Sequence, residues 1–237
     1  MTKFKEFLKF HLLPKKIYLG LSAQNKYRRA ERSQETELKI LPEIVDRDKT
    51  AIDIGANTGL YTYFLAKYAR DVIAFEPHEL FADFLMKAVA DNVVVINKGI
   101  SNTISQLPFY IPVKYGQKQM NIASFDKPTN PDMSYLTQLV DTVTLDLMGF
   151  ENVGFIKIDV EGHEYSVLQG AEKLIRSQRP LIQVEILGNP EEKRKNRTLA
   201  LLRDYRYEVY IYTDNELKKM NSIDPLYYGK NFICLPS

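Results

Sequence analysis

The sequence has few of the residues that cross-link a chain or bind transition metals. Its 237 residues include one cysteine, Cys234, three histidines and no tryptophan. One thiol excludes a disulfide scaffold and a thiolate zinc cluster, and three histidines disfavour a Cys/His metal site. We therefore expect a protein of a reducing compartment that folds around a hydrophobic core.

Long apolar runs are also missing. No apolar run approaches the roughly 20 residues that span a bilayer. Near the N-terminus, Lys9 and His11 interrupt the apolar segment 7–13, so this segment is not typical of a secretory signal. These absences predict a cytoplasmic protein.

What is present is the composition of a folded globular protein. With 45% hydrophobic and 26% charged residues, the chain is neither a disordered tail nor a fibre. Positive charge is concentrated at one end, because residues 1–32 carry nine Lys and Arg against two Asp and Glu. The rest of the chain is mildly acidic.

The basic N-terminal segment has an amphipathic pattern. Its apolar residues recur at helical spacing among lysines: Phe4, Phe7, Leu8 and Leu12. Such a helix can rest on an anionic membrane, bind RNA or a phosphate-bearing carrier, or pack on the body with its lysines in solvent. We predict a basic helical appendage over residues 1–47, with peripheral membrane contact through residues 1–32 as one alternative.

From Thr50 onward, short apolar runs alternate with helical patterns. Strands are predicted at 51–54, 72–75, 93–96, 154–160, 181–187, 207–212 and 231–235. Helices are predicted between them, among them 58–68, one helix carrying residues 167–175, and 191–205. This rhythm is typical of βαβ units. It predicts an α/β fold over residues 48–237, with a doubly wound, mostly parallel sheet and helices on both faces.

The rhythm breaks between residues 99 and 145. Strand-like alternation at 107–113 and 140–145 is separated by a polar stretch rich in Pro, Asn, Gln and Tyr. A connection this long inside a compact domain is usually functional or mobile. We interpret residues 114–138 as a candidate lid over a substrate, with a passive surface excursion as the alternative.

Polar residues follow five of the predicted strands. In an open parallel sheet, ligands bind beyond the carboxyl ends of the strands. The residues at these ends are 53–59, Glu76 with Pro77, 97–101 (which includes Ser101), 159–164 and Glu185. Burial alone would not favour polar residues there, so we predict that they form the ligand site.

The first of these turns discriminates between cofactors. A dinucleotide fingerprint requires G-x-G-x-x-G, but Asn57 and Leu60 occupy the positions of its second and third glycines. Asp53 would also oppose a diphosphate, at a cost of about 4 kcal/mol per contact at about 4 Å and an effective dielectric near 20. A nicotinamide cofactor is therefore disfavoured.

The same turn suits S-adenosylmethionine. Asp53 can attract its ammonium group and sulfonium centre, and the glycines Gly55 and Gly59 would let its amino-acid end approach the backbone closely. Glu76 offers paired acceptors for the two ribose hydroxyls. We predict an S-adenosylmethionine site that also includes Asn57, Pro77, Ser101 and Asp159.

Four segments resemble a known family. They are AIDIGANTGLYT at 51–62, FEP at 75–77, TVTLD at 142–146 and KIDVEGHEYSVLQGA at 157–171. Over about residues 48–235 the chain resembles the FkbM-type methyltransferases, and residues 1–47 lie outside this resemblance.

The resemblance implies a class I, Rossmann-like fold with a seven-stranded sheet. It also implies O-methylation of a hydroxyl on a sugar, glycan or natural product. By the same resemblance, Asp53, Gly55, Asn57 and Glu76 would bind the cofactor, and residues 159–164 would border the methyl-transfer site.

Methyl transfer to a hydroxyl needs an in-line approach and a group that removes or polarises the hydroxyl proton. His163 is a candidate base because its pKa range lies near working pH, with helix capping as the alternative. Asp159 is a second candidate, either as base or as ligand for the cofactor ammonium. Glu161 is a third, although acids near a helix N-terminus are favourable whatever the chemistry.

A divalent metal is a further alternative. Asp159 and Glu185 would come from the ends of neighbouring strands, and their oxygens suit magnesium or calcium. Such an ion would lower the pKa of a bound hydroxyl. Two carboxylates are a thin coordination set, so the sequence leaves the metal open.

Other classes of function are weaker but open. Amino methylation of adenine typically uses a D/N-P-P-Y/F tetrad where this chain has I-D-V-E-G-H, and Cys234 lies in an apolar strand rather than after a proline. Nucleic acid is therefore disfavoured as the acceptor. A nucleotide-cofactor oxidoreductase and a non-catalytic binding module on the same fold remain alternatives.

Overall fold

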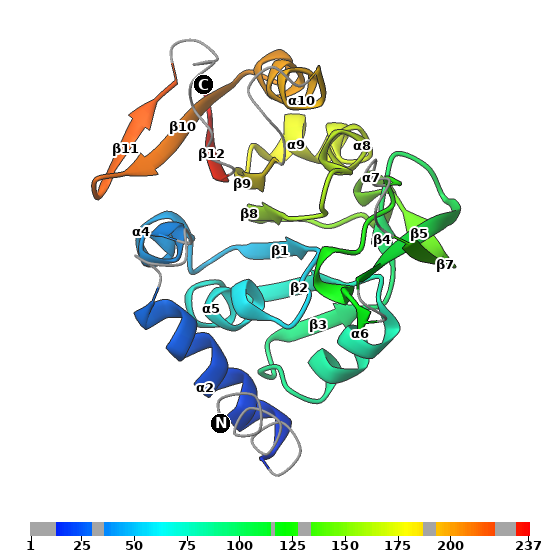
Figure 1. The fold of residues 1–237 in the computed structure, drawn as a ribbon. Helices are drawn as coiled ribbons and strands as arrows, with labels where there is room; N and C mark the ends of the chain where they lie inside the picture. Colours follow the sequence, from blue (N-terminus) through cyan, green and yellow to red (C-terminus); the bar gives the residue numbers. More distant parts are fainter. Residues whose placement is uncertain (1–12, 30–35, 115–116, 128–133, 187–192, 221–230) are drawn as a thin grey trace.

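The computed structural model describes residues 13–29, 36–114, 117–127, 134–186, 193–220 and 231–237, which form two sheets and their covering helices (Figure 1). The larger sheet has eight strands in the order β11-β10-β12-β9-β8-β1-β2-β3. Its strands are β1 (Thr50–Ile54), β2 (Asp71–Phe75), β3 (Val93–Ile96), β8 (Val153–Ile158), β9 (Leu181–Glu185), β10 (Tyr207–Thr213), β11 (Glu216–Lys219) and β12 (Asn231–Pro236).

The centre of this sheet is parallel, as predicted. β3, β2, β1, β8 and β9 pair in parallel, whereas β12 runs antiparallel to both β9 and β10. From β1 the strands run outward through β2 to β3 on one side, and from β8 they run outward through β9 on the other side. The order therefore reverses between β1 and β8, which makes the sheet doubly wound. The predicted α/β fold is confirmed.

The expected strand count of seven is one too low, because β11 adds an eighth strand at the edge. All four of its residues are exposed, so it has no apolar pattern for the sequence to reveal. β11 is instead held by the backbone through a hairpin with β10, whose two-residue turn places Asp214 and Asn215 at positive φ. That conformation at both central residues is the type I′ turn favoured in short hairpins.

Alternating side chains bury both faces of the central strands. On one face, Ala51 and Phe155 pack with Phe64 and Leu65 of α5 (Leu60–Tyr68). On the other face, residues such as Ile156 pack against α8 (Glu164–Gln169), α9 (Glu172–Gln178) and α10 (Lys193–Asp204). α6 (Glu79–Met86) joins α5 on the first face (Figure 1). Both faces are therefore mainly apolar.

The predicted helix over residues 167–175 is two helices. α8 ends at Gln169 and α9 begins at Glu172. Gly170 lies between them, where a Cβ atom would fall 2.0 Å from the carbonyl oxygen of Ser101. The two short helices therefore meet at a point where backbone from another part of the chain passes closely.

The break at residues 99–145 corresponds to a second sheet. It has the order β4-β7-β5-β6, with β4 (Gly99–Ile100), β5 (Ser105–Lys114), β6 (Gln117–Lys118) and β7 (Ser134–Val143). The predicted strand at 140–145 instead ends at Val143, because Thr144 begins the short helix α7 (Leu145–Met148). β5 and β7 form a long antiparallel hairpin beside the main sheet (Figure 1).

The connection between β5 and β7 folds back onto β5. It contains η2 (Met120–Ile122), and Tyr110 and Ser124 exchange backbone hydrogen bonds of 2.8 and 3.1 Å. We call residues 119–127 the strap. Residues 115–116 and 128–133 of the candidate lid lie outside the described residues, and the lid stays a prediction.

The described part of residues 1–47 packs on the main sheet's helices. α2 (Lys15–Arg28) buries Leu19 and Ala23, and the short elements η1 (Thr36–Lys39) and α4 (Leu41–Ile44) bury Leu38 and Leu41 completely. The amphipathic pattern between Phe4 and Leu12 lies outside the described residues and stays a prediction. No helix in the described part of the chain is long and apolar enough to cross a membrane.

Candidate functional site

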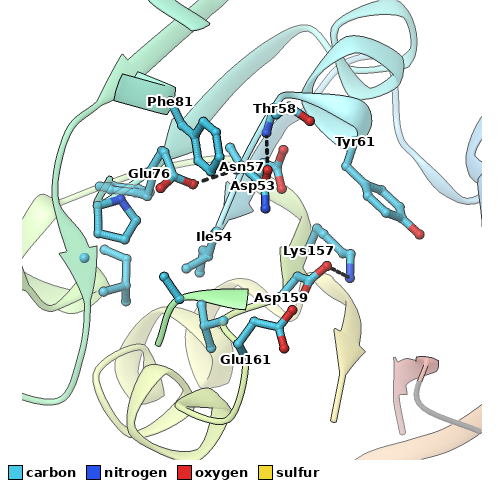
Figure 2. A pocket seen from close by; sticks show the side chains of 18 of the residues that line it. Asp53, Ile54, Asn57, Thr58, Tyr61, Glu76, Phe81, Lys157, Asp159 and Glu161 are labelled. Carbon is cyan, nitrogen blue, oxygen red and sulfur yellow. Dashed lines mark hydrogen bonds and ion pairs between the residues drawn. The ribbon is translucent and has the colours of Figure 1, made fainter. Parts of the chain in front are cut away.

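The predicted strand ends meet at one cleft. It has a volume of about 350 Å³ and is lined from the ends of β1, β2, β8 and β9, as well as from β4. Further lining residues come from α5 and α6 (Leu60, Tyr61 and Phe81) and from β5, the strap and α2 (Phe109, Met120, Ala123, Phe125 and Lys26). Figure 2 shows Asp53, Glu76 and Asp159 around it. The predicted strand ends therefore line one cleft, as expected for a ligand that binds beyond the carboxyl ends of parallel strands.

Gly55 lets two strand ends come together. Its φ is +82°, and a Cβ atom built there would lie 1.8 Å from the Asp159 carbonyl oxygen. The amides of Gly55 and Ala56 both donate to the carbonyl of Phe75, over 2.9 and 3.0 Å. That Gly55 also lets a ligand approach the backbone closely stays a prediction.

Gly59 has a packing role and does not line the cleft. It is the N-cap residue of α5 with φ +86°, and a Cβ atom there would lie 2.5 Å from a methyl group of Leu85. The structure therefore places Gly59 against α6 rather than with the cleft residues of the same turn.

Asp53 is a buried carboxyl at the end of β1. Asp53 Oδ2 accepts a hydrogen bond from the Thr62 hydroxyl at 2.5 Å, and Asp53 is 1% exposed. Burial raises the pKa of Asp53 from 3.8 to about 6, against the opposing effects of the Thr62 hydrogen bond and the Lys157 ammonium. The side chain is therefore an anion at neutral pH whose charge is little screened by water.

Glu76 is the corresponding carboxyl at the end of β2. Its two oxygens accept backbone N–H groups, Oε1 from His78 at 2.8 Å and Oε2 from Asn57 at 2.6 Å. Asn57 reaches it from a left-handed conformation with φ +51°. Burial raises the pKa of Glu76 from 4.5 to about 7, although these two donors lower it. Pro77 lines the cleft beside it.

Lys157 is a cleft residue that the sequence analysis missed. It lies on β8 directly across from Asp53 in the parallel pairing and is 1% exposed. Its Nζ lies 3.5 Å from Asp159 Oδ2 and 4.7 Å from the centre of the Tyr61 ring (Figure 2). The signal for it was a lysine inside an apolar strand, which is rarely buried without a partner.

The acidic segment after β8 divides between cleft and turn. Asp159 and Glu161 line the cleft, and Glu161 has a positive φ of 53°. Glu164 is fully buried, and its Oε1 accepts the Gly162 amide at 2.7 Å. Glu164 therefore supports the start of α8, whereas Asp159 and Glu161 face the ligand space.

The donor set does not fit a metal. The described residues contain no group of three or more His, Cys, Asp or Glu side chains that could hold an ion. Asp159 is instead paired with the Lys157 ammonium. Glu185 lines the same cleft but adds only a second carboxylate. We therefore derive no chemistry from a metal bound by Asp159 and Glu185.

His163 and Ser101 lie together, but not among the residues lining the cleft. His163 Nε2 is 3.0 Å from the Ser101 hydroxyl, and Nδ1 is 3.1 Å from Asp126 Oδ1 on the strap. Ser101 is 1% exposed, and the hydrogen bond is partly buried. His163 is the N-cap residue of α8 but makes no capping hydrogen bond with its side chain.

The histidine nevertheless touches the cleft wall. The ring of Phe125, which lines the cleft, lies 5.3 Å from the His163 ring. Both ring nitrogens are engaged, so His163 would have to release Ser101 or Asp126 to accept a proton from a substrate. In this arrangement it joins the strap to the body.

The comparisons with known proteins bear on this site. The model of the methyltransferase FkbM domain matches residues 53–209. The chain belongs to the FkbM methyltransferase family. The match covers the cleft from Asp53 to Glu185, and it confirms the resemblance seen in the sequence. A search of curated proteins found no match.

Solved structures are similar to this chain at low identity. A candidate rRNA methylase from Clostridium thermocellum superposes with a TM-score of 0.52 at 14% identity, covering 86% of this chain and 94% of that one. The FkbM methyltransferase from Methylobacillus flagellatus gives 0.49 at 16%, covering 80% of this chain and 44% of that one. This chain therefore spans less than half the length of that FkbM protein.

A third structure was solved with a ligand. A candidate methyltransferase from Streptococcus mutans, in complex with SAH, gives a TM-score of 0.48 at 15% identity, covering 84% of this chain and 94% of that one. At these identities the likenesses describe the fold alone. The Clostridium thermocellum structure, with the TM-score of 0.52, agrees with a Rossmann-like methyltransferase fold for this FkbM family member.

Proposed function

We propose that this FkbM family member is an S-adenosylmethionine-dependent O-methyltransferase that acts on a hydroxyl of a sugar, glycan or natural product. The observation that carries the proposal is the pair of buried carboxyls, Asp53 and Glu76, at the ends of adjacent strands in one cleft. When bound, the cofactor supplies an electrophilic methyl group on a sulfonium centre.

The residues in the cleft fit the two ends of this cofactor. Each carboxylate oxygen of Glu76 accepts one hydrogen bond from a backbone amide. Each oxygen can accept a second hydrogen bond, here from a ribose hydroxyl. Phe81 lines the cleft next to Pro77 and offers an aromatic face for the adenine. Asp53 provides a buried negative charge for the ammonium group.

The same carboxyls argue against a nucleotide oxidoreductase. A diphosphate in this cleft would lie against an acid that is 1% exposed, where charge repulsion is strong. Two further residues, Asp159 and Glu161, add negative charge at the end of β8. A non-catalytic binding module would also show such a cleft, so turnover is the decisive measurement.

A neutral hydroxyl acceptor is supported by the charge of the cleft. Among the described lining residues, five are acidic and three are lysines. A phosphodiester backbone would be repelled by this surplus, whereas a polyol would not. Asp159 and Glu161 face the space and can accept a proton from an acceptor hydroxyl. His163 is the third candidate base.

Binding comes first in the test. Isothermal titration should show S-adenosylhomocysteine binding and no NADH binding. Asp53→Asn should weaken the first about tenfold or more, because a charged hydrogen bond is lost. NADH binding in place of the sulfur compound would overturn the proposal. Radiolabelled methyl transfer to sugars, polyketide alcohols and transfer RNA would then identify the acceptor, with label on RNA alone contradicting a sugar, glycan or natural-product acceptor.

The cellular setting is also part of the proposal. Cys234 is buried and makes no disulfide, which suits the cytoplasm. Contact of residues 1–32 with an anionic membrane would bring the enzyme to a membrane-bound acceptor. Co-sedimentation of full-length and 1–32-deleted protein with anionic vesicles tests this, and equal partition of both would rule it out.

A further inference from the structure

Lys157 is a buried cation in a cleft lined mainly by acids. Among the described lining residues the lysines are Lys26, Lys98 and Lys157, and only the last is buried. It projects from the central strand β8, where burying a charge without compensation is costly. Asp159 and Asp53 lie near this ammonium, and an anionic group of a ligand in the cleft would meet the same charge.

The contacts Lys157 makes inside the protein are long. Its Nζ lies 3.5 Å from Asp159 Oδ2 and 3.4 Å from the carbonyl oxygen of Ile158. A charged N–H···O bond is usually about 2.7–2.9 Å. An ammonium has three N–H groups to donate, so these contacts and the face of Tyr61 leave it capacity for a closer acceptor.

Asp53 and Lys157 together present opposite charges side by side. They are paired residues on neighbouring parallel strands, so their side chains project from the same face of the sheet. The ammonium and carboxylate of an α-amino acid are held on a single carbon atom. A neighbouring anion and cation at the floor of the cleft match that arrangement of charges.

We propose that Lys157 binds the carboxylate of the cofactor's methionine moiety, while Asp53 receives its ammonium group. This inference rests on the proposed function, because it assigns a binding residue for the same cofactor. The two side chains together select a ligand that carries an amino-acid end. An adenosine thioether without that end would bind through the Glu76 side of the cleft alone.

Three ligands separate these contacts by titration calorimetry, without need of the acceptor. S-adenosylhomocysteine carries both charged groups, its decarboxylated analogue carries the ammonium only, and methylthioadenosine carries neither. Lys157→Met should lower the affinity for S-adenosylhomocysteine about tenfold or more. It should leave the affinities for the other two ligands within about twofold, because neither has the carboxylate.

Matched variants control for loss of structure. Lys195 is also a 1% exposed lysine, but it lies on α10 outside the cleft lining, so Lys195→Met should leave all three affinities unchanged. Lys157→Arg should retain most of the affinity for S-adenosylhomocysteine. If Lys157→Met does not fold, Lys157→Gln gives the same comparison with a polar end in place of the charge.

The outcomes distinguish the inference from the proposed function. Equal loss for S-adenosylhomocysteine and its decarboxylated analogue would show that Lys157 acts only by shaping the site around Asp53, and the inference would be wrong. Unchanged affinity for S-adenosylhomocysteine would also overturn it. If the unaltered protein binds none of the three ligands, the proposed cofactor itself fails.

Discussion

The backbone of Gly55 and the carbonyl of Asp159 are in such close contact that any side chain between them would have to displace one of the two strand ends. A Cβ atom at Gly55 would lie 1.8 Å from that oxygen, far inside van der Waals contact. The two residues follow β1 and β8, the central strands of the sheet. The floor of the cleft therefore depends on the absence of one methyl group.

Gly55→Ala should be strongly destabilising. Positive φ alone costs about 1–2 kcal/mol for a residue with a side chain, and the backbone clash should bring the total to about 3 kcal/mol or more. Urea unfolding measures the change. Gly149→Ala is the control, because Gly149 also has positive φ but a Cβ atom there would meet no other atom within 4 Å, so only the conformational cost applies. Equal losses in the two variants would contradict the clash.

The buried acids should make the free energy of unfolding fall as pH rises through the acidic range. The pKa is raised from 3.8 to about 6 at Asp53 and from 4.5 to about 7 at Glu76, chiefly by burial. Between those values the unfolded chain has released the proton while the folded protein retains it, so raising the pH favours unfolding. Each carboxyl contributes a fall of up to about 1.4 kcal/mol per pH unit within its window.

Denaturant titrations from about pH 4 to about pH 8 test this. Glu76→Gln and Asp53→Asn should each reduce the fall in the free energy of unfolding over the pH range in which the replaced carboxyl titrates. This holds whatever their effect on absolute stability. Asp141→Asn is the control, because that carboxyl is exposed and its pKa is lowered by Gln106 and Lys98. A pH profile that neither cleft variant alters would show that the carboxyls are not buried as described.

The contact between His163 and Asp126 should hold the strap in place. Asp126→Ala removes the acceptor 3.1 Å from Nδ1 and should speed hydrogen exchange at the Ser124 and Tyr110 amides, which bond to each other's carbonyls. Ser101→Ala removes the hydrogen bond to His163 Nε2. It should speed exchange at these amides less, because Ser101 lies on the body and not on the strap. Exchange unaffected by Asp126→Ala would mean that the backbone pairing alone fixes the strap.

The hairpin at the sheet edge should depend on its turn conformation. Asn215 has φ +61°, so Asn215→Val should cost about 1–2 kcal/mol whereas Asn215→Gly should be neutral or stabilising. Thermal unfolding of the two variants provides the comparison, and Glu216→Val, on the adjoining exposed strand, serves as control. Equal effects of valine and glycine at this position would be inconsistent with the turn.

Much of the fold could be predicted because it depends on local apolar patterns. The central strands β1 and β8 are short hydrophobic runs, and the polar residues Asp53, Glu76 and Asp159 mark the strand ends that meet at the cleft. The edge strand β11 could not be found in this way, since all four of its residues are exposed.

The remaining misses come from contacts between distant parts of the chain. The break between α8 and α9 lies where Gly170 meets the Ser101 carbonyl, 69 residues earlier in the sequence. The pairing of His163 with Asp126 depends on a fold-back of the strap that composition does not reveal. Lys157 was missed because its apolar run indicates only a buried strand, although a lysine inside such a run is itself a signal of a buried charge.

The smaller sheet forms part of the cleft wall, but the cleft carboxyls belong to the main sheet. Its hairpin reaches the cleft through Phe109, and its first strand supplies Gly99 and Ile100 to the same wall, whereas the carboxyls lie on the separate main sheet. A longer hairpin, or a hairpin of different sequence, would change this wall of the cleft and leave the main-sheet residues in place. Changes confined to this hairpin would therefore leave in place the main-sheet strands that carry Asp53 and Glu76 to the cleft.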